Sequence, residues 1–436
     1  MQQFTPFILL FVLLFFSACA SKKAPYPTEL QDIKQYEQKA TNYLKNVPNI
    51  QYYDQLKFDK VFNQKYFQPW HIKKPYATKK QAMWGNVYAK RKVYGDNHKQ
   101  ISKAWFKQQI NNANFDEYST VLRKAITTNN SALRVFPTNS KIFYNPKKAG
   151  EGFPFDYNQN SGIKINSPLL ISHYSKDRAW AYVQASFASG WIQINDIAYV
   201  SEIIAKKFES GNYYIAIKDN FAIYKNGLFK EYIKLGTLFP KTKSGKYLTI
   251  GKDINLNGFL STVQLNEEQI DKKPIKLNKS NVATIFNELI SEPYGWGELL
   301  NHRDCSALTR DFIAPFGIYL GRNSAAQKSQ GKYYNLSKLT NEEKKEYIIK
   351  HAIPYLTLIY MKGHIMLYIG QEKEEPLAFH NIWGIKTLEE DGEQGRFIIG
   401  RAVVTGLNPG AELLNINKKK TLLERITGIT LLNQKR

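Results

Sequence analysis

Residues 301–312 read NHRDCSALTRDF and contain Cys305, one of only 2 cysteines in the 436-residue chain. Ser306 and the residues after it form helix readily, and Asp304 stands where a helix N-cap would stand. The stretch therefore predicts a helix that begins at Cys305 and ends at Pro315. Because the amides and dipole of a helix N-terminus stabilise an anion, a thiol at this place is a candidate nucleophile.

The other cysteine, Cys19, follows an uncharged apolar run, FTPFILLFVLLFFSA, at residues 4–18. The run is too short for a stable membrane span and ends in small residues, as a secretory signal segment does. Its last residues and Cys19 read FSAC, which resembles a bacterial lipobox. We therefore expect a lipoprotein signal peptide at residues 1–19, with Cys19 lipidated and Cys305 left as the one free thiol. An ordinary signal peptide with an incidental cysteine is the alternative.

The composition limits the classes of partner. Hydrophobic residues make up 43% and aromatic residues 14% of the chain, enough to build folded cores. The formal net charge is +24, and a basic surface fits nucleic acid, phospholipid headgroups or an acidic wall polymer. Export argues against nucleic acid. Lysine-rich composition also serves solubility, so the charge alone does not identify the partner.

The residue pattern changes along the chain and predicts five parts after the signal peptide. Residues 20–50 are polar and predict a tether, and residues 51–128 are mixed, aromatic-rich and partly helical. Residues 129–206 and 207–275 hold short strand-like runs between Asn, Ser, Gly and Pro, which predict two small β-barrels. Residues 276–436 predict an α+β domain in which the thiol-bearing helix packs on an antiparallel sheet, the order of a papain-like hydrolase core.

A thiol nucleophile needs a base within reach and a group that holds this base in one tautomer. Of the 7 histidines, His364 follows Gly363 at the start of a strand-like run, where its side chain would lie at the rim of a sheet. His380 lies in the next such run, and antiparallel pairing would bring it beside His364. With Cys305 they fit a nucleophile, a base and an orienter. A zinc site is the weaker alternative, because no close-spaced pair of ligands exists.

The stretch YGWGELLNHRDCSALTRDFIAPFG at residues 294–317, with GHIMLYIGQ and AFHNIWG after it, resembles the catalytic core of the NlpC/P60 cell-wall peptidases. Upstream, the segments RVFPT, FDYNQ and GWI resemble the first SH3-like domain of a multidomain subgroup. That subgroup has an N-terminal stabilising domain and two SH3-like barrels before the peptidase. The resemblance implies that Cys305 attacks the scissile carbonyl, that His364 moves the proton and that His380 orients His364.

The resemblance also implies roles in substrate binding. Tyr294 matches a tyrosine that borders the oxyanion site, and Asp304 and Ser306 match residues that shape the substrate pocket. Asp304 would pair with the free amine of an N-terminal L-alanine, and the bond cut would join γ-D-glutamate to a diamino acid. The alternative is that Asp304 only caps its helix. No cofactor and no metal is implied.

The sequence leaves several functions open. A catalytically inactive peptidoglycan-binding lipoprotein and an acyltransferase or amidase on the same core are the alternatives to a peptidase. The expected partners are peptidoglycan stem peptides and a membrane, through the anchor at Cys19, with the protein as a monomer in the cell envelope. Ala20 and Ser21 carry no aspartate retention signal, which favours the outer membrane, on its periplasmic side, in a cell with two membranes.

Overall fold

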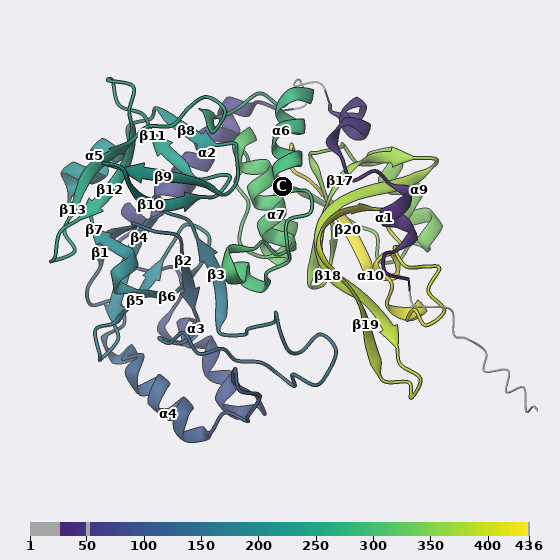
Figure 1. Ribbon diagram of the computed structural model, residues 1–436, viewed down its shortest axis with the longest axis horizontal. Helices are drawn as coiled ribbons and strands as arrows, with labels where there is room; N and C mark the ends of the chain where they lie inside the picture. Colours follow the sequence, from purple (N-terminus) through teal and green to yellow (C-terminus); the bar gives the residue numbers. More distant parts are fainter. Residues whose placement is uncertain (1–26, 49–52, 435–436) are drawn as a thin grey trace, which may run out of the picture.

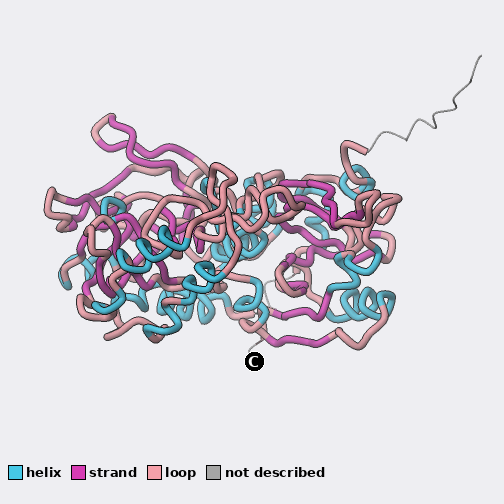
Figure 2. Tube along the Cα trace, turned by 90° about the horizontal axis from the view of Figure 1, so that it is seen from below, coloured by secondary structure: helices cyan, strands magenta, loops and turns pink. Residues whose placement is uncertain are grey.

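The computed structural model describes residues 27–48 and 53–434, so the expected signal peptide lies outside the described residues. Figure 1 shows the β modules that follow the N-terminal helices at the left and the sheet of the C-terminal domain at the right. Helices α6 (Lys279–Leu289) and α7 (Cys305–Ile313) lie between them. Seen from below in Figure 2, the strands again gather in these two groups.

The N-terminal region is helical, but its first part is no free tether. Leu30 and Ile33 are buried in the core of the C-terminal domain. The side-chain amide of Gln38 exchanges two hydrogen bonds with the backbone of Val404, at 3.0 and 2.8 Å. Residues 27–48 therefore belong to the folded body, because their apolar side chains are removed from water there. The helices of this region are α1 (Gln31–Gln35), η1 (Ala40–Asn46), α2 (Gln55–Phe67), η3 (Gln68–Trp70), α3 (Lys79–Ala82), η4 (Trp84–Lys90), α4 (Lys103–Asn112) and η5 (Phe115–Glu117).

The first β module is a 7-stranded antiparallel sheet in the order β3-β2-β6-β5-β4-β1-β7. It begins at Arg123, ahead of the predicted boundary at residue 129, because Arg123–Thr127 pairs with both β4 and β7. The long segment between β2 and β3, residues 135–158, is here named the cleft loop because it reaches toward the C-terminal domain (Figure 1). The strands are β1 (Arg123–Thr127), β2 (Ser131–Arg134), β3 (Gln159–Ile163), β4 (Pro168–Tyr174), β5 (Trp180–Gln184), β6 (Ser189–Gln193) and β7 (Ile197–Tyr199).

The second β module consists of three small sheets, β10-β9, β11-β8-β14 and β12-β13. Asn226 and Gly227, with φ of 51° and 78°, form the two-residue turn between β9 and β10 that the Asn-Gly pair predicts. Helix α5 (Glu202–Phe208) leads into this module. Its strands are β8 (Tyr213–Ala216), β9 (Phe221–Lys225), β10 (Leu228–Ile233), β11 (Leu238–Pro240), β12 (Tyr247–Lys252), β13 (Gly258–Val263) and β14 (Ile270–Lys272).

The C-terminal domain is built on a 6-stranded antiparallel sheet in the order β15-β20-β16-β17-β18-β19. Strands β17 and β18 match the strand-like runs predicted around His364 and His380. Residues of α6 and α7 share one core with one face of the sheet, and residues of α1, α9 and α10 share another with the opposite face. The remaining elements are η7 (Trp296–Asn301), η8 (Ala314–Phe316), α8 (Ser324–Lys328), β15 (Lys332–Asn335), α9 (Asn341–His351), β16 (Thr357–Met361), β17 (His364–Glu372), β18 (Glu375–Leu388), β19 (Gln394–Thr405), η9 (Lys418–Lys420), α10 (Leu422–Arg425) and β20 (Ile426–Leu431).

Candidate active site

Cys305 is the first residue of α7, which packs against β17, and its side chain is only 8% exposed. Burial and the neighbouring Asp304 carboxylate raise the pKa of the Cys305 thiol to about 12, although the backbone amide of Ile365 favours the thiolate. The thiol is therefore protonated at neutral pH. The helix N-terminus does not by itself deprotonate it, contrary to the expectation from the sequence, because burial outweighs the helix dipole.

His364 and His380 lie side by side, with His364 Nε2 and His380 Nδ1 2.8 Å apart. His380 Nε2 in turn lies 3.0 Å from the hydroxyl oxygen of Thr405. The single hydroxyl hydrogen of Thr405 is donated to the carbonyl of Gly406 at 2.6 Å, so its oxygen accepts the Nε2–H of His380. His380 Nδ1 then accepts the Nε2–H of His364, which leaves Nδ1 of His364 as a free lone pair.

Both imidazoles are neutral at pH 7. Burial comes first, followed by the charge that His380 carries when it is protonated and by the charge of Arg425, and together they hold the pKa of His364 well below 6.5. Burial lowers the pKa of His380 to about 3. The resting site therefore combines a protonated thiol with a neutral base in one fixed tautomer. Thr405, which fixes this tautomer, was missed in the sequence because nothing local marks it.

Tyr294 lies close enough to Cys305 for a thiolate there to disfavour ionisation of the phenol. Burial, and then the charges of Cys305 and Asp304, keep the pKa of Tyr294 well above 10. Its ring centroid lies 6.3 Å from that of Phe155 in the cleft loop and 6.0 Å from that of Trp383 on β18. Phe155 of the cleft loop and Tyr294 therefore form an aromatic wall beside Cys305. The sequence pointed to Tyr294 but did not identify Phe155.

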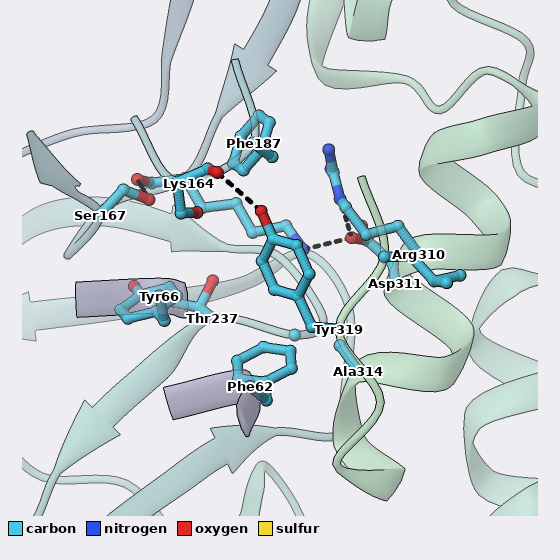
Figure 3. Close-up of a pocket in the computed structure, with 13 residues that line it drawn as sticks. Phe62, Tyr66, Lys164, Ser167, Phe187, Thr237, Arg310, Asp311, Ala314 and Tyr319 are labelled. Atoms are coloured by element: carbon cyan, nitrogen blue, oxygen red, sulfur yellow. Dashed lines mark hydrogen bonds and ion pairs between the residues drawn. The ribbon is translucent and has the colours of Figure 1, made fainter. Parts of the chain in front are cut away.

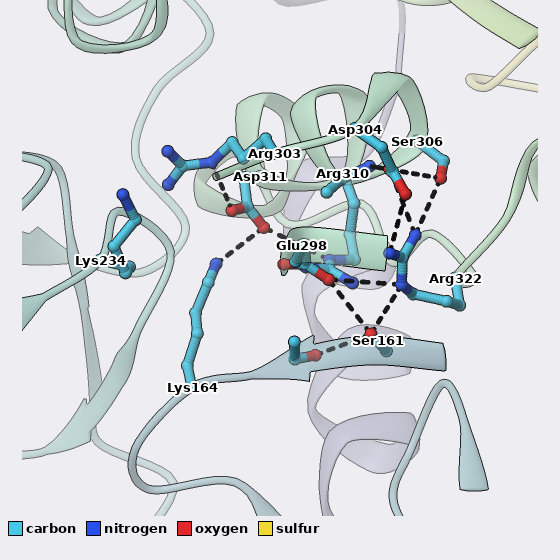
Figure 4. Close-up of polar contacts among 12 residues, drawn as sticks. Ser161, Lys164, Lys234, Glu298, Arg303, Asp304, Ser306, Arg310, Asp311 and Arg322 are labelled. Atoms are coloured by element: carbon cyan, nitrogen blue, oxygen red, sulfur yellow. Dashed lines mark hydrogen bonds and ion pairs between the residues drawn. The ribbon is translucent and has the colours of Figure 1, made fainter. Parts of the chain in front are cut away.

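Asp304 is held by several partners at once. Its Oδ1 accepts from the backbone amide of Ala307, which makes it the N-cap of α7, at 2.8 Å, and from the hydroxyl of Ser306 at 2.9 Å. Arg322 donates to both oxygens, at 2.8 and 3.2 Å, and the amide of Gly297 donates to Oδ2 at 3.2 Å. These contacts lower the pKa of Asp304 against the effect of burial, with Arg322 as the main stabilising charge. Asp304 and Ser306 thus lie in an internal polar network, as Figure 4 shows.

Comparison with protein families matches three segments of the chain. Residues 8–118 match the N-terminal NLPC_P60 stabilising domain, and residues 141–193 match the SH3 domain of SH3b1 type. Residues 291–390, which hold Cys305, His364 and His380, match the NlpC/P60 family, a family of cysteine peptidases. The C-terminal domain is an NlpC/P60 domain. This agrees with the multidomain α+β fold predicted from the sequence.

A solved structure has the same overall fold as this chain. An NlpC/P60 endopeptidase from Photobacterium damselae subsp. piscicida superimposes with a TM-score of 0.82 at 23% identity, over 92% of this chain and 98% of that chain. An NlpC/P60 family protein from Bacillus cereus aligns with a TM-score of 0.45 at 14% identity, over 70% of this chain and 98% of that chain. A comparison with curated proteins found no match. The first structure therefore supports the overall fold.

A buried polar network joins the NlpC/P60 domain to the first β module (Figure 4). Glu298 pairs with Arg310 at 2.6 Å and accepts from Ser161 of β3 at 3.1 Å. Glu298 has a φ of 63°, a strained backbone for a side chain of this kind. At Gly297, an added side chain would lie 2.7 Å from the carbonyl oxygen of Gln159. The loop before α7 is therefore shaped by its contact with β3.

A separate pocket, open to solvent and with a cavity volume of about 60 Å³, lies between α2, both β modules and α7. Figure 3 shows Lys164 paired with Asp311 there, at 2.7 Å, and the hydroxyl of Tyr319 donating to the carbonyl of Ser186. Burial lowers the pKa of Lys164 to about 8. Neither Cys305 nor the two histidines line this cavity, so it is distinct from the candidate active site.

Across residues 27–48 and 53–434, no group of three or more His, Cys, Asp or Glu side chains is arranged to hold a metal ion. Within the same residues, no helix is both long and apolar enough to cross a membrane.

Proposed function

We propose that this protein is a cysteine peptidase that hydrolyses peptidoglycan stem peptides. The observation that carries the proposal is the hydrogen-bonded line from Thr405 through His380 to His364. His364 begins β17, the strand against which the thiol-bearing helix α7 packs, within the segment that matches the NlpC/P60 family. A nucleophile, a base and a group that fixes its tautomer are the parts that acyl transfer requires.

The neutral resting state determines how the proton moves. Because the Cys305 thiol is protonated, its proton passes to Nδ1 of His364 as the sulfur attacks the scissile carbonyl. The imidazolium that forms keeps its hydrogen bond to His380. It then gives the proton to the leaving amine, the C–N bond breaks, and a thioester remains on Cys305. Water activated by His364 hydrolyses the thioester and restores the thiol.

For the substrate, we propose a stem peptide with a free N-terminal L-alanine, cleaved between γ-D-glutamate and the diamino acid. The aromatic wall of Phe155 and Tyr294 supports a narrow site beside the first β module. Pairing of Asp304 with the substrate amine stays a prediction, since Arg322 already shares its carboxylate. An amine bound there would have to share the buried carboxylate with Arg322.

The test is digestion of purified tripeptide and tetrapeptide stems, free and still joined to the sugar, followed by mass spectrometry. We expect cleavage of the free peptides between D-glutamate and the diamino acid, and none by the Cys305→Ala variant, which keeps a small residue at the helix start. Release of the whole stem from the sugar would indicate an amidase instead. Binding without cleavage would indicate an inactive wall-binding protein.

We also propose that the protein acts as a lipid-anchored monomer in the cell envelope, held through Cys19. The FSAC sequence after an apolar run supports this placement. Replacing Cys19 with Ala should move the protein from the membrane fraction to the soluble fraction without changing its turnover of soluble peptides. The net charge of +24 adds only a salt-sensitive attraction. Retention of the variant on membranes in high salt would contradict the anchor.

A further inference from the structure

Four basic side chains of the NlpC/P60 domain gather around the β18–β19 hairpin, η9 and α10. Lys386 on β18 and Arg396 on β19 are direct partners in the antiparallel register. Burial lowers the pKa of Lys386, and the positive charges of Arg425, Arg396 and Lys420 lower it further. Lys420 and Arg425 therefore lie close to Lys386. We name Lys386, Arg396, Lys420 and Arg425 the cation cluster.

The charges of the cation cluster are not compensated within the described chain. None of its members forms an ion pair with an acid of residues 27–48 or 53–434. The Nε of Arg396 is buried without a hydrogen-bond partner. Like charges directly opposite each other destabilise a sheet, so the Lys386–Arg396 pair costs free energy that an anion between them would recover.

The position of the cation cluster ties it to the proposed reaction. Arg425 donates at 3.1 Å to the carbonyl of Lys362, in the turn that precedes His364, and its charge reaches His364 itself. Arg396 lies close enough to Tyr294 for the two groups to interact electrostatically. An added side chain at Gly150 of the cleft loop would collide with the Arg396 guanidinium. The two arginines of the cluster therefore lie at the rim of the site on its histidine side.

We propose that the cation cluster binds a free carboxylate on the leaving group of the cleaved peptide. This inference rests on the proposed function, in which His364 protonates the leaving amine. A general acid must touch the atom that it protonates, so the leaving residue passes beside His364 and then Arg425. An amino acid carries its carboxyl group one carbon from its amine, within reach of guanidinium groups at this rim. Arginine also suits the planar carboxylate.

The test uses two synthetic peptides, L-Ala-γ-D-Glu-L-Lys with a free C-terminal carboxylate and the same peptide with a C-terminal carboxamide. Binding of each is measured by calorimetry on the full chain carrying Cys305→Ala, so that no turnover interferes. We expect the carboxylate peptide to bind roughly tenfold more tightly, the effect of one charge-assisted contact. Arg396→Gln and Arg425→Gln should each weaken the carboxylate peptide and leave the carboxamide unchanged.

The control is Arg401→Gln, on the same strand, because Arg401 already pairs with Glu29 at 2.7 Å. It should keep the preference. Equal affinity of the two peptides for the parent protein, or no binding of either, would overturn the inference without recourse to any variant. Turnover by the protein with Cys305 intact separates the two proposals. If the carboxylate peptide binds more tightly but neither peptide is hydrolysed, the proposed peptidase activity is wrong. If both peptides are hydrolysed and bind with equal affinity, only the proposed role of the cation cluster is wrong.

Discussion

On the side of Cys305 that faces the first β module, the charged groups are paired, whereas on the β18–β19 side the cation cluster has no acid partner among the described residues. The Asp304 carboxylate and the Arg322 guanidinium form a buried ion pair at 2.8 Å. Lys386 and Arg396 face each other as like charges. Arg322 acts on Cys305, and Arg425 of the cation cluster acts on His364. The contrast therefore separates charges that stabilise the shape of the site from charges that we propose bind a ligand.

The paired side should be the more costly one to break. Arg322→Met leaves the Asp304 carboxylate buried without its cation, and breaking such a pair costs about 3–5 kcal/mol. We expect a loss of this size in the free energy of urea unfolding, together with loss of activity. The double variant Arg322→Met/Asp304→Asn, which removes both charges and keeps a cap, should recover part of it. An unchanged unfolding midpoint for the single variant would mean that the pair is open to water.

Low pH should lower the free energy of unfolding, because His364 and His380 are buried in their neutral forms. In the folded protein the pKa of His364 is held well below 6.5 and that of His380 lies at about 3. The unfolded chain therefore binds more protons as pH falls below 6.5, and the free energy of unfolding should fall by about 1.4 kcal/mol per pH unit for each histidine. Urea unfolding between neutral pH and about pH 5 measures this slope.

The control for this pH dependence is His380→Asn, which should make the slope shallower without abolishing it. His173 in the first β module, whose pKa burial lowers to about 4, contributes in the same direction and remains. A stability that does not change over this range would show that these imidazoles are accessible to water in the folded protein.

Thr405 should separate activity from stability on the same side. Thr405→Val keeps the shape of the side chain but removes the oxygen that accepts from His380, so His380 can take the wrong tautomer. We expect kcat to fall about tenfold, the weight of one hydrogen bond, with KM nearly unchanged and a pH profile that shifts. Thr405→Ser should restore the rate. If Thr405→Val and Thr405→Ser change kcat equally, Thr405 contributes only packing.

The smallest effect on stability should come from removing one of the unpaired charges of the cation cluster. Lys386→Gln removes one of two like charges that face each other across β18 and β19. Such a pair costs about 0.2–1 kcal/mol, so the variant should be slightly more stable than the parent in the absence of peptide. A loss of stability instead would mean that Lys386 has a structural partner and that the two sides differ less than their contacts indicate.

Local signals in the sequence determined the elements that carry the chemistry. An aspartate before a helix-forming run predicted the start of α7 at Cys305, and Gly363, with a φ of 84°, marks the turn before His364. The Asn-Gly pair at 226 and 227 likewise predicted its hairpin. Each of these signals acts within a few residues, because caps, turns and strand alternation depend on the nearest backbone groups.

Only the tertiary structure decided how these elements are completed. The pairing of Asp304 with Arg322, the contact of Thr405 with His380 and the docking of residues 27–48 on the C-terminal domain join segments that no local pattern connects. The protonation states follow from the same source, since burial raises the pKa of the Cys305 thiol and lowers that of His364. Burial and charge pairing depend on distance in space, and residue order alone does not contain that distance.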